Sequence, residues 1–483
     1  MLLVFLLHVF FVSFLDKPEK SVPQLSPRAI EQRERWHIPT DEKDYPVSPL
    51  YLGELQKAGA TVYHTSRWFN GATVEMDEET AEKVRAIKFV TDVEMTREAV
   101  SPQPSDGSDL RQKSKIANSK IANSKIANSK IESQLQAYSD KQLELYNLPP
   151  LHEAGFEGQG IVMAVCDGGF YNAQTLSCFR QEELELGHFD FTDDTDDFYG
   201  STGTHGTECL STISALTADY KGAATKAHYY LMRAEENATE SPKEMDNLVA
   251  ALEKADSLGV NIFTVSLGYA IFDNEEWTLD KSALDGKSTR SSLAATIAAR
   301  KGMLVCVAAG NEGNSAWKTI NSPADADSIL TVGAVDTIGG ISGFSSYGPS
   351  ADGRVKPEVC AVGVKTVLVH PNGTIVAGNG TSFATPLIAG MAASLWSALP
   401  QENAMQIRER IIRSADRFAN PDEERYGYGI PDAWKAYTMT LPAGQSELHS
   451  PQGVSRKILR NGHIYIIRGE HAFDLLGREL ENL

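Results

Sequence analysis

The chain has 483 residues, of which 42% are hydrophobic and 23% are charged, and its formal net charge is -19 at pH 7. At roughly 100–200 residues per domain, this length predicts two to four globular units. The acidic balance argues against a nucleic-acid partner, because phosphate binding needs a basic surface. The cysteines number five, an odd count without metal-binding spacing, so we expect mostly free, buried thiols.

The first fifteen residues, MLLVFLLHVFFVSFL, contain only His8 and Ser13 as polar side chains. This run is too short for a membrane span, so we expect no transmembrane segment. An export signal suits the run, although it lacks a basic start and a small-residue cleavage site. A buried first strand suits it too. We therefore predict a signal over residues 1–15 that overlaps the first strand of the next unit.

Residues 10–100 predict a small α+β unit ahead of the main domain. A strand-like VFFVSFL comes first, and a helix follows with Pro27 at its first position, where proline is favoured. Helix, strand, strand, helix and strand patterns then continue to residue 96. If the two successive helices count as one helical segment, the order is β-α-β-β-α-β, that of the split ferredoxin-like fold.

Residues 101–137 differ in character from both neighbours. Three copies of SKIAN and a degenerate fourth place an isoleucine at every fifth position. That spacing matches neither the helical period of about 3.6 nor the strand period of about 2, so no single face is apolar. We predict a low-complexity linker.

Residues 138–440 alternate apolar strand patterns with helical patterns. The strand candidates are GIVMAVC, HYYLMRA, VNIFTVSLG, MLVCVAAG and ILTVGAV. Near-continuous apolar strands separated by helices predict an α/β domain of three layers, with a parallel sheet flanked by helices. Functional residues of such sheets lie beyond the carboxyl ends of the strands. Residues 441–483 predict a short β-rich tail of two or three strands, joined at Asn461-Gly462 and Arg468-Gly469.

Three residues stand where strands or loops of this domain end. Asp167 follows an apolar strand, His205 lies in a Gly/Thr loop, and Ser382 precedes a helix. Each alone suits an ordinary role, as a turn residue, a surface histidine or a helix N-cap. Together, in the chain order Asp, His, Ser, they predict a nucleophile, a base and an orienting carboxylate. Asn311, after a strand that ends in Gly310, could donate its amide to an oxyanion beside the Ser382 N–H.

Six ordered motifs carry a family resemblance. They are VCDGGF around Asp167, GTHGTE around His205, VSLG, VAAGN ending at Asn311, FSSYGP, and GTSFATP around Ser382. With them the chain resembles the subtilisin-like serine proteases, the subtilase or peptidase S8 family. The resemblance implies a subtilisin-like fold and a serine endopeptidase that works through an acyl-enzyme intermediate and requires no cofactor.

The same resemblance implies several further roles. Ser266, Leu267 and Gly268 are expected to bind the extended polypeptide substrate as an added strand. The unit at 10–100 resembles the inhibitory prodomains of Bacteroidetes subtilases, which implies a self-processed zymogen with its prodomain as an intramolecular inhibitor. The family also implies an exported enzyme, secreted or associated with the cell envelope.

The sequence departs from the family at some positions. Gly168 stands where most members have Thr or Ser, Glu208 where many have a second His, and Cys209 resembles the near-site cysteine of some members. The acidic segment 189–200 suits either a solvated loop or a calcium site, so calcium is an open alternative and no metal ligand is assigned.

Two other functions fit the same pattern. One is a catalytically silent binding protein on the same fold, since fold alone does not establish chemistry. The other keeps the triad but acts on esters or non-protein amides, although a prodomain argues for protein substrates.

Overall fold

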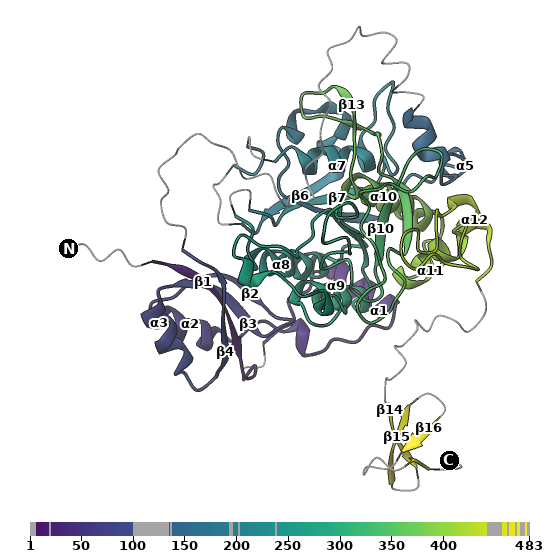
Figure 1. Cartoon of the computed structure of the whole chain (residues 1–483). Coiled ribbons are helices and arrows are strands. Elements are labelled where there is room, and N and C mark those ends of the chain that lie inside the picture. Colours follow the sequence, from purple (N-terminus) through teal and green to yellow (C-terminus); the bar gives the residue numbers. More distant parts are fainter. Residues whose placement is uncertain are drawn as a thin grey trace. The chain divides into compact units, whose positions relative to one another are not determined.

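The computed structural model describes residues 6–18, 21–99, 138–192, 197–200, 203–236 and 239–441, with Leu135 and four short strands between 456 and 480. It divides into two units, Met1–Met439 and Thr440–Leu483, and each is described by itself (Figure 1). The linker predicted over 101–137 lies almost wholly outside the described residues.

The N-terminal part is an antiparallel sheet with strand order β2-β3-β1-β4, backed by two helices. The strands are β1 (His8–Phe14), β2 (Thr61–Ser66), β3 (Gly71–Met76) and β4 (Val90–Arg97), and the helices are α2 (Pro49–Ala58) and α3 (Glu78–Arg85). Alternate β1 side chains face opposite ways. Phe10 and Val12 join the core under α2 and α3. On the other face the Phe11 ring lies 4.5 Å from the Arg290 guanidinium. The predicted split ferredoxin-like order is confirmed.

The helix predicted from Pro27 exists but stands outside that motif. It is α1 (Pro27–Arg35), where Ser26 caps the start by accepting from the Ala29 N–H. None of its residues belongs to the core of the N-terminal sheet among the described residues. The two helices of the motif are therefore α2 and α3, and α1 is an insertion between β1 and α2.

The main sheet has seven parallel strands in the order β11-β10-β9-β8-β5-β7-β6. Their bounds are β5 (Val162–Asp167), β6 (Glu185–Asp190), β7 (His228–Arg233), β8 (Ile262–Val265), β9 (Leu304–Ala308), β10 (Leu330–Val335) and β11 (Val359–Val362). All five predicted strands are present. The sequence pattern missed β6, whose alternating burial marks a half-exposed edge strand, and the short β11.

Helices cover both faces of this sheet, which confirms the three layers. Met163 and Val165 of β5 pack with α7 (His205–Ser214) and α10 (Thr381–Ala398). Ala164 and Cys166 pack on the other face with α8 (Lys243–Leu258) and α9 (Arg290–Arg300). The remaining elements of this unit are α5 (Pro149–Glu153), α6 (Gln181–Leu184), β12 (Thr366–Val369), β13 (Ile375–Gly378), α11 (Ala404–Ser414) and α12 (Ala433–Thr438).

The C-terminal unit contains an antiparallel sheet of β14 (Arg456–Arg460), β15 (His463–Arg468), β16 (His471–Phe473) and β17 (Glu479–Leu480). This is one strand more than the largest number predicted. All five cysteines are buried and unpaired, as expected. In the described part of the chain, no helix combines the length and apolarity that crossing a membrane demands.

Candidate active site

The residues singled out in the sequence gather at the carboxyl edge of the main sheet. Asp167 is the last residue of β5, while Ser266 and Asn311 follow β8 and β9. Two details differ from expectation. His205 is the first residue of α7 rather than a loop residue, and Ser382 lies inside α10, whose N-cap is Gly380. Ser382 is therefore not a capping serine.

Asp167 and His205 form the best-defined pair of the site. The Nδ1 of His205 lies 2.8 Å from the Oδ1 of Asp167, and both residues are buried. Because a carboxylate oxygen accepts this hydrogen bond, Nδ1 carries a proton, and in the neutral imidazole the lone pair is therefore on Nε2. The Gly168 N–H also donates to Oδ1, at 2.8 Å, which holds the carboxylate in place. The imidazole is thus oriented as a base through Nε2.

Electrostatics at this pair favour the protonated histidine. Burial is the largest single effect and disfavours the imidazolium, but the charge and hydrogen bond of Asp167 together with the neighbouring Cys209 outweigh it, so the pKa of His205 lies well above its ordinary value. An imidazole that has taken up a proton is therefore strongly stabilised in this position.

Ser382 belongs to the same cluster but does not hydrogen-bond to His205 among the described contacts. Its Oγ donates to the Ser266 carbonyl over 3.5 Å. Its own carbonyl accepts from the Ser266 Oγ at 2.8 Å and from the Cys209 Sγ at 3.3 Å. Pro386 leaves this carbonyl available for these two donors, since a proline has no N–H to donate to the residue four positions earlier.

Cys209 connects the serine to the histidine. Its Sγ lies 3.8 Å from both ring nitrogens of His205, so the sulfur sits over the face of the ring rather than in its plane. Burial raises the pKa of this thiol to about 11. It is therefore a thiol at neutral pH and fills space between His205 and α10.

Asn311 is fixed by the start of α10. Its Oδ1 accepts from the Thr381 N–H at 2.9 Å and from the Thr381 Oγ1 at 3.0 Å. A backbone N–H needs an acceptor, so this contact assigns the oxygen and turns Nδ2 the other way. A Cβ built on Gly380 would lie 3.7 Å from the Ser382 nitrogen and 3.8 Å from the Asn311 Nδ2. Both donors therefore border the space that Gly380 leaves open by lacking a side chain.

The Ser266–Gly268 segment leaves β8 beside Ser382. Leu267 is buried, and Tyr269, the first residue after the segment, exchanges two backbone hydrogen bonds with Ser322, of 2.7 and 3.0 Å. These bonds fix the end of the segment, while Ser266 contacts Ser382 at its start.

The absence of a side chain at Gly168 is explained by Glu235, a residue that the sequence pattern did not single out. A Cβ on Gly168 would come within 2.8 Å of the Glu235 Oε2, so a carboxylate occupies the space of the usual Thr or Ser. Glu235 follows β7 and shares a cluster with Glu240 and Glu244, whose ligand atoms lie within 4.8 Å of one another. Burial holds the pKa of Glu244 well above its usual range.

The acidic segment 189–200 gives no assembled cation site within its described residues. Asp190 accepts from the Thr192 N–H and Oγ1, at 2.9 and 2.7 Å, and from Arg233 at 3.2 Å. In the described chain, the close clusters of three potential metal ligands are the Glu235 group and Asp167, His205 and Cys209, outside this segment. Calcium stays a prediction.

Comparison with known proteins agrees with this geometry. Residues 158–429 match the model of the subtilase family, and residues 9–116 match that of the Peptidase S8 propeptide domain of Bacteroidota. Subtilisin NAT of Bacillus subtilis subsp. natto is 29% identical over 287 residues, covering 58% of this chain and 67% of the relative. Subtilisin DY of Bacillus licheniformis is 29% identical over 282 residues, covering 57% of this chain and 90% of the relative.

A solved structure supports the fold alone. MycP1 from the ESX-1 type VII secretion system aligns with a TM-score of 0.52 at 22% identity, covering 64% of this chain and 88% of that one. The family model spans more than half of the chain, and a propeptide model precedes it. The chain therefore belongs to the subtilase family of serine endopeptidases and carries a propeptide domain at its N-terminal side.

Proposed function

We propose that the chain hydrolyses peptide bonds with Asp167, His205 and Ser382 as its catalytic triad. The observation that carries this proposal is the 2.8 Å contact between His205 and Asp167, buried beside Ser382 at the carboxyl edge of the sheet. It leaves Nε2 as the base on the side away from the carboxylate.

The first half of the reaction forms an acyl-enzyme. The Ser382 Oγ rotates away from the Ser266 carbonyl, attacks the peptide carbonyl and gives its proton to the His205 Nε2. Asp167 stabilises the imidazolium, in line with the raised pKa of His205. The oxyanion accepts from the Ser382 N–H and the Asn311 Nδ2, which border one space. His205 then protonates the amine, which leaves.

Water completes the cycle by the same route in reverse. His205 takes a proton from the water that attacks the acyl-enzyme ester, and returns it to the Ser382 Oγ as the acid is released. Side chains of this chain and water supply every proton in these steps. The substrate is held as an extended strand along Ser266, Leu267 and Gly268.

We propose further that the chain is an exported zymogen that cuts itself within residues 96–137. The course of the propeptide supports this. The Arg97 guanidinium at the end of β4 pairs with Glu236 at 2.6 Å, and the Glu98 carboxylate accepts from Asn274 at 3.4 Å. Glu236 and Asn274 lie in the loops after β7 and β8, so the propeptide leaves its sheet at the edge that carries the active site.

Replacement of the nucleophile tests both statements. Ser382→Ala should accumulate as an uncut and inactive chain, and should lose labelling by a fluorophosphonate probe. Asn311→Ala should keep the label but lose about 10²–10³-fold in kcat on a peptide substrate. Mass spectrometry of the purified chains reads the processing. A processed and active Ser382→Ala protein would contradict the triad, and absent labelling of the wild type would favour a silent binding protein.

A further inference from the structure

We propose that residues 25–45, here called the arm, are a second anchor of the prodomain. The arm binds the catalytic unit at the amino ends of the main strands, whereas the active site lies at their carboxyl ends. It keeps the prodomain bound after the linker is cut. This inference rests on the proposed zymogen function, but its test does not require catalysis.

The arm contacts the catalytic unit through its backbone and through Arg28. The Ser26 N–H donates to the Ser257 carbonyl at 2.8 Å. The Arg28 Nε donates to the Gly259 carbonyl at 2.9 Å, and its Nη2 to the Asn261 Oδ1 at 2.6 Å. A Cβ on Gly259 would lie 2.7 Å from the Ala29 nitrogen, so helix α1 approaches more closely than any other residue there would allow.

This contact lies at the amino ends of the main strands. Residues 259–261 join the end of α8 to the start of β8, and residues 301–303 join α9 to β9. Because β5, β8 and β9 run parallel, Asp167 at the end of β5 lies at the other edge. The arm therefore cannot act by filling the catalytic cleft.

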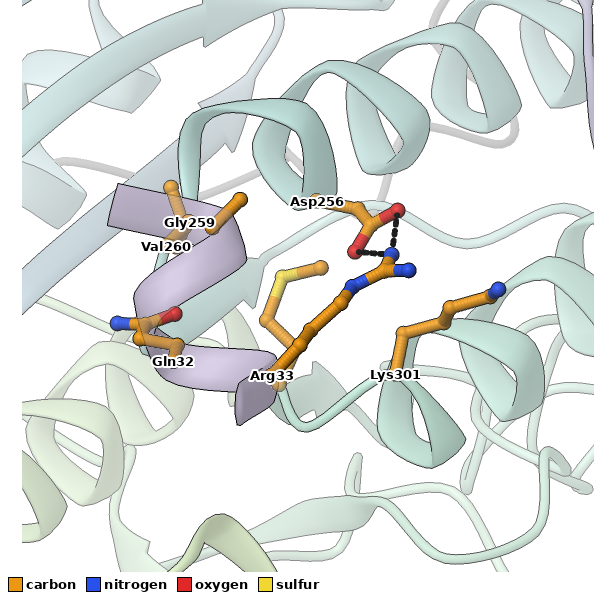
Figure 2. Close-up of a pocket in the computed structure, with 8 residues that line it drawn as sticks. Gln32, Arg33, Asp256, Gly259, Val260 and Lys301 are labelled. Carbon is orange, nitrogen blue, oxygen red and sulfur yellow. Dashed lines mark hydrogen bonds and ion pairs between the residues drawn. The ribbon is translucent and has the colours of Figure 1, made fainter. Parts of the chain in front are cut away.

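Buried charges of both signs meet in this contact. Figure 2 shows Arg33 reaching from α1 to Asp256, with oxygens at 2.7 and 2.8 Å, beside Lys301. Arg33 also pairs with Asp44 of the arm at 2.7 Å, and Lys301 contacts Asp44 at 3.0 Å. All four of these side chains are less than 10% exposed. The arm and the catalytic unit each contribute one cation and one anion, so a partner without this pattern would leave a buried charge unpaired.

The arm site is linked to the prodomain sheet through the same helix. The Arg67 Nη2, in the turn between β2 and β3, contacts the Asp256 Oδ2 at 2.5 Å. One turn earlier, the Glu253 carboxylate accepts from the Ser66 Oγ at 2.6 Å and from the Arg67 and Trp68 N–H groups at 2.9 and 3.1 Å. The last two turns of α8 thus bind the arm and the sheet together.

A second anchor changes what cutting the linker achieves. The cut separates the two chains but breaks none of the arm contacts. While the arm stays docked, the inhibitory end of β4 remains at a high effective concentration beside the cleft and rebinds after each opening. Release of activity then depends on loss of the arm.

The test uses the full chain with Ser382→Ala, a C-terminal affinity tag, and residues 118–124 replaced by the recognition sequence of an unrelated protease. The chain is cut by that protease and immobilised, and release of the prodomain is followed during washing. Arg33→Met and Lys301→Met should release it about 100-fold faster or more, because each removes one of the two cations that a buried carboxylate of this contact is paired with. Lys57→Met is the control, since Lys57 pairs with Glu54 on the prodomain surface and its side chain is 75% exposed.

Release within about threefold of the control in both variants would overturn the proposal. Thermal unfolding of the uncut chains shows whether they fold. If Arg33→Met and Lys301→Met do not, Arg28→Ala replaces them, with release expected about tenfold faster for its two lost hydrogen bonds; an unchanged rate overturns the proposal equally. If the Ser382→Ala chain is already processed before the added protease cuts it, the nucleophile assignment is contradicted. The release rates would still test the arm.

Discussion

At the scale of single residues, Glu208 is a carboxyl group in an environment that disfavours its charge. It is 1% exposed, its Oε1 has no hydrogen-bond partner among the residues that the structure describes, and the His370 Nε2 is 3.9 Å away. Burial raises its pKa from 4.5 to about 7, against the attraction of nearby His205 and together with the repulsion of Asp167. Glu208 therefore favours the folded state only while it is neutral.

This gives Glu208→Gln a stability effect that depends on pH. The raised folded pKa means that the stabilisation is present below pH 4.5 and is lost as the pH rises through 7. Glutamine stays neutral, so the advantage of the variant should grow by about 3 kcal/mol between pH 4.5 and 8. Urea unfolding in the Ser382→Ala background measures it, with Glu183→Gln, 70% exposed, as the control. Parallel pH profiles for Glu208→Gln and its parent would refute the burial argument.

The catalytic candidates were predictable because each stands next to a strand or helix that the sequence pattern reveals. The rotamer of Ser382 was not predictable, since its Oγ contact to Ser266 joins positions 116 residues apart. Glu235 was missed for the same reason. The residues near Gly168 in the sequence do not indicate that the Glu235 carboxylate fills the space beside it.

At the scale of elements, two helices use glycine for different reasons. In α10 a Cβ on Gly390 would come within 2.6 Å of the Ala223 Cβ, because this helix is buried against a neighbouring loop. In α2 a Cβ on Gly53 would meet nothing within 4 Å. The first glycine permits close packing, whereas the second only weakens its helix.

The same substitution should therefore have opposite effects at the two sites. Gly390→Ala should destabilise the chain by about 1–3 kcal/mol through overpacking. Gly53→Ala should stabilise the prodomain by about 0.5–1 kcal/mol, since alanine loses less backbone entropy in a helix. Urea midpoints in the Ser382→Ala background measure both, and each variant serves as the control of the other. Shifts of the same sign would show that local space does not decide the outcome.

Elements were the level at which the sequence predicted most. Buried parallel strands have no polar face, so β5, β7, β8, β9 and β10 were visible as apolar runs. The edge strand β6 alternates over six residues and was not distinguished from a loop. For α1 the sequence predicted the helix but not its partner, because Arg33 and Asp256 are 223 residues apart.

At the scale of the whole molecule, the prodomain contacts the catalytic unit at both ends of the main strands. Arg97 pairs with Glu236 at the carboxyl ends, where the active site lies, and Arg33 pairs with Asp256 at the amino ends. Between them the prodomain sheet lies on α8 and α9, where Arg290 contacts both Glu94 and Asp246. The two outer contacts share no partner, so they should contribute independently to binding.

Independence can be measured as additivity in the cut Ser382→Ala complex. Arg97→Met and Arg33→Met should each raise the Kd of the prodomain, and the double variant should raise it by the product of the two factors, within about threefold, because distant sites add to within about 0.5 kcal/mol. The fraction of prodomain retained on serial dilution gives each Kd, with Lys57→Met as the control. A double variant no weaker than the worse single variant would mean that one edge alone holds the prodomain. The arm and the cleft would then be successive contacts of a prodomain that pivots, rather than two simultaneous anchors.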